Sequence, residues 1–191
     1  RETLTEATRL RMIADVPLGA FLSGGIDSTI TVGLMQQLAD QPVKTYSIGF
    51  PVADFDETRY ARLAAQHLKT DHHEFVVEPN CVEILPRLVW HYDEPFADSS
   101  AIPTYYVSQL TRQHVTVALT GDAGDELFAG YPRYRAVKLA EYFDRLPWAL
   151  RATVASPIWQ YLPASVRQKS KRRQFKKLVA HLREQPERRY T

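Results

Sequence analysis

The stretch FLSGGIDSTI, from Phe21 to Ile30, ends an apolar run in a serine and two glycines and then continues into an aspartate, a serine and further apolar residues. The preceding segment, PLGAFL, is short, apolar and flanked by proline and glycine, which favours a buried strand. The following segment, DSTITVGLMQQLAD, has apolar residues at Ile30, Leu34 and Leu38, which is helical spacing. Residues 17–39 therefore predict a strand, a glycine loop and a helix.

The alternation of strand and helix continues along the chain. The segments VKTYSIGF, HHEFVV and VTVALT predict three further strands, over residues 43–50, 72–77 and 115–120. Helical spacing predicts helices over residues 4–14, 54–68, 82–92 and 102–112, with Asp54 or Asp56 as the N-cap of the second of these. Strands that alternate with helices imply a parallel sheet with right-handed crossovers. The predicted fold class is α/β, a doubly wound parallel sheet.

The pattern weakens after about residue 132. Residues 133–146 and 170–184 have helical spacing, prolines separate the segments, and no further strand is evident. We therefore expect an α/β domain over residues 1–135 and a helical extension of the same domain over residues 136–191, which we expect to be truncated.

Composition restricts the class of protein. The 191 residues are 45% hydrophobic, enough for a substantial core, yet no apolar run reaches the roughly 20 residues of a membrane-spanning helix. We expect a cytoplasmic protein with no membrane partner. The only cysteine, Cys81, excludes an intrachain disulfide and is interpreted as a small residue within a helix.

Charge is distributed unevenly. Residues 167–191 hold ten Lys and Arg against two Glu, whereas residues 1–166 hold fourteen basic and twenty acidic residues. A basic run of this kind is commonly a solvated helix face, and no aromatic stacking platform accompanies it. Nucleic acid is therefore an unlikely partner.

The glycine loops indicate an anion site. Ligands of a doubly wound sheet lie beyond the carboxyl ends of the strands where strand order reverses, usually between the first strand and its neighbour, here the fourth. Ser23, Gly24 and Gly25 can turn backbone amides toward one point, because glycine lacks both a Cβ and the usual restriction on φ. The helix that begins near Asp27 adds the positive end of its dipole, so the loop predicts a phosphate site.

Asp27 is unexpected in a simple anion site, because a carboxylate repels phosphate unless a cation lies between them. Mg²⁺ characteristically bridges a carboxylate and phosphate oxygens. The loop after the fourth strand, residues 121–130, supplies Asp122, Asp125 and Glu126. The two loops together predict carboxylates around a metal-bound polyphosphate, although each loop alone could be an ordinary turn that opens a helix.

Two other polar groups have structural interpretations. His72 and His73 are adjacent in a predicted strand, so their side chains point to opposite faces and do not form a joint metal site. The segment DEPFADSS contains helix-start residues, among them Asp98 and Ser100, which either cap the next helix or lie near the substrate.

The motifs resemble a known family. LSGGIDS resembles the pyrophosphate-binding loop of ATP pyrophosphatases, and YSIGF, DEPFADSSAIPTYYVS and LTGDAGDELFAGYPRY resemble the synthetase domain of glutamine-hydrolysing asparagine synthetases. The motifs occur in the family's order from about Thr5 to Tyr134, and the resemblance implies that the predicted sheet is of the Rossmann-like adenine nucleotide alpha hydrolase type, with a helical C-terminal extension. The resemblance implies adenylation of the aspartate side chain by ATP, which releases pyrophosphate and leaves β-aspartyl-AMP, followed by attack of glutamine-derived ammonia to give asparagine.

The resemblance also implies a role for each matching residue. Adenine is bordered by two apolar residues, ribose and the α-phosphate are contacted at the start of the second loop, and Mg²⁺ is held by one aspartate from each loop. These are, in that order, Leu22 and Ile48, then Thr120 and Gly121, then Asp27 and Asp125, with Ser23, Gly24, Gly25 and Ser28 around the pyrophosphate. Asp122 faces the amino acid or the ammonia, at a position where the family often has glutamate.

Two features of the family are not found in this sequence. The glutaminases use an N-terminal cysteine in a preceding domain, and the synthetase domain uses a lysine well downstream of the second acidic loop. We therefore expect a fragment of a larger amidotransferase whose N-terminal glutaminase domain is a partner in the full-length protein. The expectation for the fragment is ATP binding with Mg²⁺ and weak or absent synthesis.

Three other functions remain open. The acceptor could be that of a β-lactam synthetase, which has the same domain type. The chain could be another ATP pyrophosphatase, such as a tRNA-modifying thiolase, although it has no paired cysteines for sulfur chemistry. A non-catalytic nucleotide-binding module is the third, because the downstream lysine has no match.

Overall fold

The computed structural model describes residues 1–51, 56–161 and 171–183. Contacts divide the chain into two units, Arg1–Gly124 and Asp125–Thr191, which are described separately. The predicted division of the domain at residue 135 stays a prediction.

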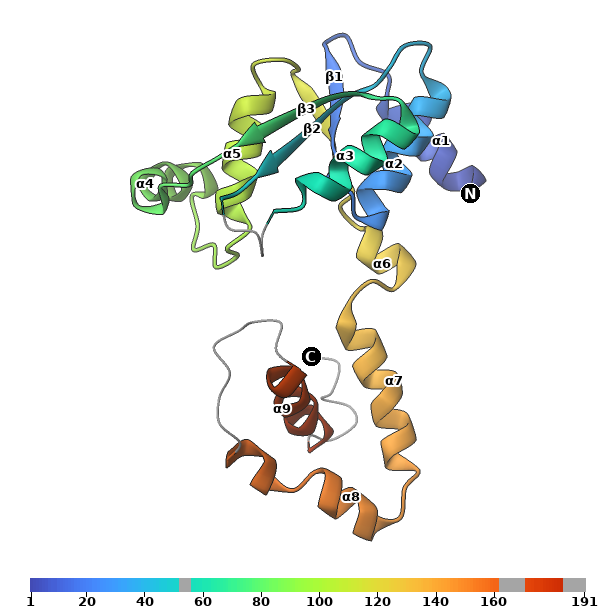
Figure 1. The fold of residues 1–191 in the computed structure, drawn as a ribbon, viewed down its shortest axis with the longest axis vertical. Helices are drawn as coiled ribbons and strands as arrows, with labels where there is room; N and C mark the ends of the chain where they lie inside the picture. The colour runs from blue at the N-terminus through green and yellow to red at the C-terminus, as the bar shows by residue number, and fades with distance from the viewer. Residues whose placement is uncertain (52–55, 162–170, 184–191) are drawn as a thin grey trace. The chain divides into compact units, whose positions relative to one another are not determined.

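The first unit contains a four-stranded parallel sheet in the order β3-β2-β1-β4 (Figure 1). Its strands are β1 (Leu18–Phe21), β2 (Lys44–Gly49), β3 (Asp71–Val76) and β4 (Val117–Leu119). Gly19 of β1 is paired with Lys44 of β2 on one side and with Ala118 of β4 on the other. The predicted α/β class and the adjacency of the first and fourth strands are confirmed, and strand order reverses at β1.

Helices connect the strands as predicted, with boundaries that differ by a few residues. They are α1 (Glu2–Arg11), α2 (Ile26–Leu38), α3 (Thr58–Leu68), α4 (Cys81–Tyr92) and α5 (Ala101–Thr111). The N-cap residue of α3 is Glu57, one position after the predicted Asp56, and its side chain makes no capping bond. Asp56 Oδ1 instead accepts hydrogen bonds from the amide and hydroxyl of Thr58, at 3.1 and 2.8 Å. The other predicted cap, Asp54, lies outside the described residues. Cys81 is in a helix, as predicted, but it is exposed.

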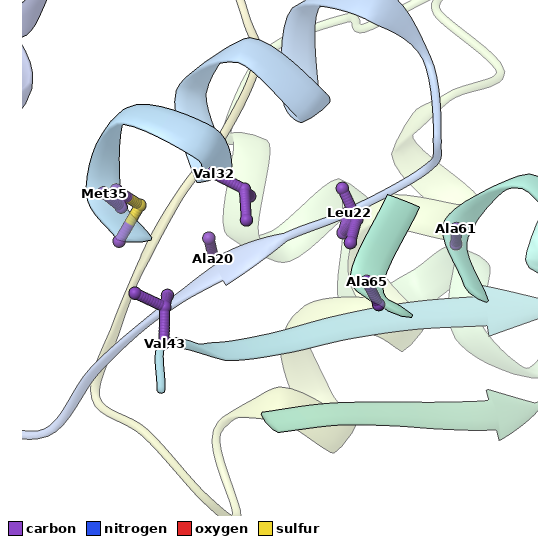
Figure 2. Packing of buried hydrophobic residues seen from close by; sticks show 7 residues of the cluster. All are labelled: Ala20, Leu22, Val32, Met35, Val43, Ala61 and Ala65. Atoms are coloured by element: carbon purple, nitrogen blue, oxygen red, sulfur yellow. The ribbon is translucent and has the colours of Figure 1, made fainter. Parts of the chain in front are cut away.

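One face of the sheet is covered by α2 and α3. Figure 2 shows their contribution to the core, which combines side chains of β1, the residue after β1, α2, α3 and the residue before β2. The buried members of this cluster are Ala20, Leu22, Val32, Met35, Val43, Ala61 and Ala65. Because α2 and α3 are anchored on β1 and β2, the loop between β1 and α2 is fixed at the carboxyl edge of the sheet.

The other face of the sheet carries aromatic side chains. Tyr46 is fully buried and stacks on His73, with ring centroids 5.4 Å apart, and on His114, at 5.7 Å. Helix α5 contacts β2, and α4 packs on α5 through Ile84 and Leu88. The sheet therefore has helices on both faces, as a doubly wound fold requires.

The second unit is helical. It contains α7 (Pro132–Asp144), α8 (Trp148–Val154), a 3-10 helix η2 (Pro157–Tyr161) and α9 (Lys171–Leu182), and the short helix α6 (Gly124–Phe128) begins at the last residue of the first unit. Ala140 and Phe143 of α7 pack with Leu182 of α9. Helical spacing in the sequence predicted α7 and α9 but not α8 or η2, which are short segments between prolines. None of the described helices is long and apolar enough to cross a membrane.

The core predicts a large cost for truncation at Met35, which is 1% exposed. Met35→Ala should lower the free energy of unfolding by about 2–5 kcal/mol, because it removes buried apolar atoms and leaves a cavity. Leu63→Ala, at a position that is 56% exposed, should change it by less than about 0.5 kcal/mol. Urea denaturation of both variants measures the difference, and equal losses would contradict the assigned core.

His72 predicts a pH-dependent stability. Its Nδ1 hydrogen-bonds Thr45 Oγ1 at 2.9 Å, and its Nε2 lies 3.6 Å from a carboxylate oxygen of Glu74. Burial lowers the pKa of His72 below its usual value, and this outweighs the opposite effect of Glu74. The folded chain therefore binds fewer protons than the unfolded chain, so this contribution to stability is present above about pH 6.5 and falls as pH falls below it.

The test is a variant without the imidazole. His72→Gln should show a smaller loss of urea midpoint than the wild type when the pH falls from about 7.5 to about 5.5. The control is His67→Gln, which removes an exposed histidine from α3, a helix on the same face of the sheet. This variant should keep the wild-type dependence of the urea midpoint on pH. An unchanged pH dependence in His72→Gln would contradict the assignment.

Candidate functional site

The loop after β1 holds its shape with its own serine hydroxyls. Ser23 Oγ and Ser28 Oγ are 3.0 Å apart, Ser28 Oγ accepts the Ser23 amide at 3.3 Å, and Ser23 Oγ accepts the Gly25 amide at 3.2 Å. Two of the three amides predicted to face an anion are thus bonded within the loop. Helix α2 begins at Ile26 with no side-chain cap, so its first-turn amides keep their donors for an external acceptor.

Gly24 cannot be replaced by a larger residue for two reasons. Its φ is 78°, a left-handed conformation that residues with a Cβ rarely adopt. A Cβ at Gly24 would also overlap the backbone carbonyl carbon of Tyr60 and come within 2.6 Å of the Tyr60 Cβ. The loop therefore lies directly against the first turn of α3.

The loop after β4 is a tight turn. Thr120 Oγ1 donates to Asp122 Oδ2 at 2.8 Å and accepts the Asp122 amide at 3.3 Å, while the Gly124 amide donates to the Gly121 carbonyl at 3.1 Å. Ala123, between them, has a φ of 68°, which is strained for a residue with a Cβ. The carboxylate of Asp122 is thus oriented by its own loop.

The two loops touch each other. A Cβ at Gly121 would lie 2.6 Å from the Ser28 amide nitrogen and 2.9 Å from the Asp27 carbonyl carbon. A Cβ at Gly124 would overlap the side chain of Asp27. Two strand-end loops that are about a hundred residues apart in sequence therefore meet with backbone against backbone, and Asp27 lies at their junction.

Asp125 belongs to the second unit, so its predicted pairing with Asp27 stays a prediction. Its carbonyl accepts the Gly130 amide at 2.9 Å, and a Cβ at Gly130 would overlap its carboxylate. In the next turn the Tyr131 hydroxyl donates to Glu126 Oε1 at 2.7 Å, which raises the pKa of Tyr131 to about 12. Gly130 and Tyr131 are thus hydrogen-bonded to Asp125 and Glu126 of the same loop.

The donor set fits Mg²⁺. Among the residues that the structure describes, no three His, Cys, Asp or Glu side chains form a group that could hold a metal. Mg²⁺ usually binds proteins through one or two carboxylates plus waters and substrate phosphates, so it does not need an all-protein cage. Asp27, partly buried at the junction of the loops, is a suitable hard oxygen ligand.

A cavity of about 250 Å³ opens beside the first loop. Leu22, Ser23 and Ile48, all predicted at the nucleotide, line it together. Its other lining residues come from β1, β2, the start of α3 and the first half of α5, and they are Phe21, Tyr46, Ser47, Phe50, Glu57, Pro103, Thr104 and Val107. Most of the wall is apolar, which suits a flat heterocycle.

Sequence reasoning missed the α3 and α5 parts of this cavity. Glu57 lies within the helix predicted over residues 54–68 and Thr104 within the matching segment DEPFADSSAIPTYYVS, but neither was predicted at the nucleotide. Two signals in the sequence bear on these residues: Glu57 follows the end of a predicted strand, and Thr104 lies in a segment that matches a motif. The spacing of the residues does not show that either one packs near Ile48.

The structural interpretations of the other polar groups agree with their contacts. His72 bonds Thr45 and lies near Glu74, whereas His73 stacks on the aromatic face and lies 3.3 Å from Asp71. Asp98 Oδ1 accepts the Ser100 amide at 2.8 Å, just before α5 begins. Both histidines therefore have structural partners on opposite faces, and Asp98 organises the helix start.

Known proteins resemble the chain over most of its length. The family model of asparagine synthase matches residues 1–191. The "Putative asparagine synthetase (glutamine-hydrolyzing) 2" of Methanocaldococcus jannaschii is 42% identical over 153 residues, which cover 79% of this chain and 30% of that protein. Asparagine synthetase (glutamine-hydrolyzing) 1 of Bacillus subtilis is 37% identical over 171 residues, 89% of this chain and 27% of that protein.

A more distant relative has another name. Amidase chry2 of Gibberella zeae is 31% identical over 157 residues, 74% of this chain and 23% of that protein. The chain thus spans less than a third of the length of these relatives. The match of the family model over every residue, on a fold with the two paired glycine loops, shows that this chain belongs to the asparagine synthase family.

Proposed function

We propose that this chain is the synthetase part of an ATP-dependent amide-forming enzyme that adenylates the side-chain carboxylate of aspartate and converts it to asparagine. The observation that supports this most is the junction of the two strand-end loops at Asp27, beside an apolar cavity lined by Leu22 and Ile48. The names of the relatives support aspartate as the acid and glutamine as the source of ammonia.

The nucleotide would lie along the carboxyl edge of the sheet. Adenine would enter the cavity between Leu22 and Ile48, and the pyrophosphate portion would lie at the loop from Ser23 to Ser28. Ribose and the α-phosphate would then reach Thr120 and Gly121, because the second loop packs directly on the first. This order places the α-phosphorus at the junction of the loops.

In the first step a carboxylate oxygen of aspartate attacks the α-phosphorus, and the bond between that phosphorus and the α,β-bridging oxygen breaks. Negative charge grows on the departing pyrophosphate, where the amides of the first turn of α2 can donate to it. When bound, Mg²⁺ would offset the same charge, with Asp27 and Asp125 as its protein ligands. Aspartate and ATP become β-aspartyl-AMP and pyrophosphate.

In the second step ammonia attacks the activated carbonyl carbon, and AMP leaves. Asp122, held by its hydrogen bond to Thr120, would face the amino acid or the incoming ammonia, whose excess proton must leave. A glutaminase domain in the full-length protein would supply the ammonia, in keeping with the words "glutamine-hydrolyzing" in the relatives' names.

A different acid is the second candidate. The relative named an amidase shares this domain with the asparagine synthetases, so the adenylating site is compatible with another acceptor. The nucleotide chemistry would be unchanged in that case, and only the carboxylic acid would differ.

Asp27 provides a test of the metal assignment. Asp27→Asn should weaken calorimetric ATP binding in Mg²⁺ by about tenfold or more, because it removes the charge that binds the metal–phosphate complex. With EDTA in place of Mg²⁺ the variant should bind ATP no more weakly than the wild type. The matched control is Asp40→Asn, at an exposed position two residues after the end of α2, which should behave as the wild type. Equal loss with and without Mg²⁺ would contradict the role of Asp27.

The reaction itself is tested by pyrophosphate release. With MgATP and no amino acid the chain should release little, and aspartate should increase the release more than glutamate does. A calorimetric titration that shows no ATP affinity in Mg²⁺ would overturn the proposed function. Release that responds to another acid and not to aspartate would favour the second candidate.

A further inference from the structure

Glu57 is the one residue with a charged side chain among the described residues that line the cavity. The surrounding wall is formed largely by Leu22, Ile48, Phe50 and Val107. Glu57 is exposed, so water solvates its carboxylate in the empty cavity, and an occupant that reaches it can replace that water with an N–H or O–H donor. An occupant with such a donor toward the start of α3 would therefore be favoured.

Glu57 is not needed to start its helix. It occupies the N-cap position of α3, and its side chain makes no capping hydrogen bond. The neighbouring Asp56 supplies that bond, to the amide of Thr58 at 3.1 Å and to its hydroxyl at 2.8 Å. Because Asp56 makes that bond, the carboxylate of Glu57 is not used to cap α3, and Glu57 is one of the residues that line the cavity.

The backbone of Glu57 is held in place from both sides. Its carbonyl accepts the amides of Tyr60 and Ala61, at 2.9 and 3.1 Å, and Ala61 is fully buried. Gly24 packs against the backbone of Tyr60 and Ala61, and a Cβ at Gly49 would lie 2.8 Å from Thr58 Cγ2. The start of α3 is thus fixed against both the loop from Ser23 to Ser28 and the end of β2. The backbone of Glu57 therefore has a defined position relative to the proposed nucleotide site.

We propose that Glu57 is a specificity-determining residue that accepts a hydrogen bond from the 6-amino group of adenine, an inference that rests on the proposed binding of ATP. The 6-amino group is the only donor on the edge of adenine, since its ring nitrogens N1, N3 and N7 are acceptors that a carboxylate would repel. The ribose hydroxyls are also donors, but in the proposed pose they lie toward Thr120 and Gly121.

The test compares two nucleotides that differ only in this group. Purine riboside 5′-triphosphate is ATP without the 6-amino group, and its phosphate charge is unchanged. The full 191-residue chain should bind ATP about tenfold more tightly than the purine nucleotide in Mg²⁺, as expected for a hydrogen bond to a charged group. Glu57→Ala should bind the two nucleotides equally. Any general effect of removing a negative charge near the phosphates cancels in this ratio.

Two further variants sharpen the result. Glu57→Gln should keep part of the preference for ATP, because the amide oxygen can still accept from the amine. Glu78→Ala, which removes an exposed carboxylate that is not part of the cavity, should keep the full preference. Since the Glu57 side chain makes no cap bond, Glu57→Ala should fold, and its circular dichroism spectrum should match the wild type.

Three results would overturn the inference. The first is a preference for ATP that is the same in the wild type and in Glu57→Ala. The second is a loss of discrimination between ATP and 2′-deoxyATP in Glu57→Ala, because it would place the carboxylate at the ribose. The third is a wild-type chain that binds no MgATP, which would overturn the proposed function as well, whereas the first two leave that function intact.

Discussion

The candidate site depends on the absence of two side chains, at Gly121 and Gly124. A Cβ at the first would meet the backbone of Asp27 and Ser28, and a Cβ at the second would overlap the side chain of Asp27. Only glycine allows the loops after β1 and β4 to approach this closely. Because β1 and β4 are parallel neighbours, both loops leave the same edge of the sheet, and their contact brings the residues proposed to bind phosphate and metal together.

The same contact bears on how Asp27 could lie near the phosphates of the proposed nucleotide. It is in the first turn of α2, where the helix dipole favours a negative charge, and it is partly buried by the second loop. A carboxylate in that position favours a cation over a bare anion. A metal–polyphosphate complex satisfies both the amides of α2 and the carboxylate of Asp27, which neither phosphate nor metal does alone.

Much of the fold, and the pairing of the two loops, could be predicted from the sequence. The switch from an apolar run to SGG and back to helical spacing at Ile30 and Leu34 predicted β1, the loop and α2, and the repeated pattern predicted the parallel sheet. The adjacency of β1 and β4, on which the pairing of the loops depends, followed from the fold class and is confirmed. Short elements between prolines, such as α8, lack enough residues for a periodic signal.

The walls of the cavity could not be predicted in the same way. Glu57 and Thr104 reach the cavity because of how α3 and α5 pack against β2, and packing between distant segments leaves no local pattern in the sequence. Helix-start acids such as Asp56 and Glu57 look alike in sequence. The hydrogen bonds of Asp56 separate the residue that bonds the first turn of α3 from the one that lines the cavity.

The central claim is that the two loops form one nucleotide site, and amide hydrogen exchange tests it directly. Adding ATP and Mg²⁺ should slow exchange in peptides that cover residues 22–29 and residues 120–124 together, with the same dependence on ATP concentration. Protection of one loop without the other, or of neither, would contradict a shared site.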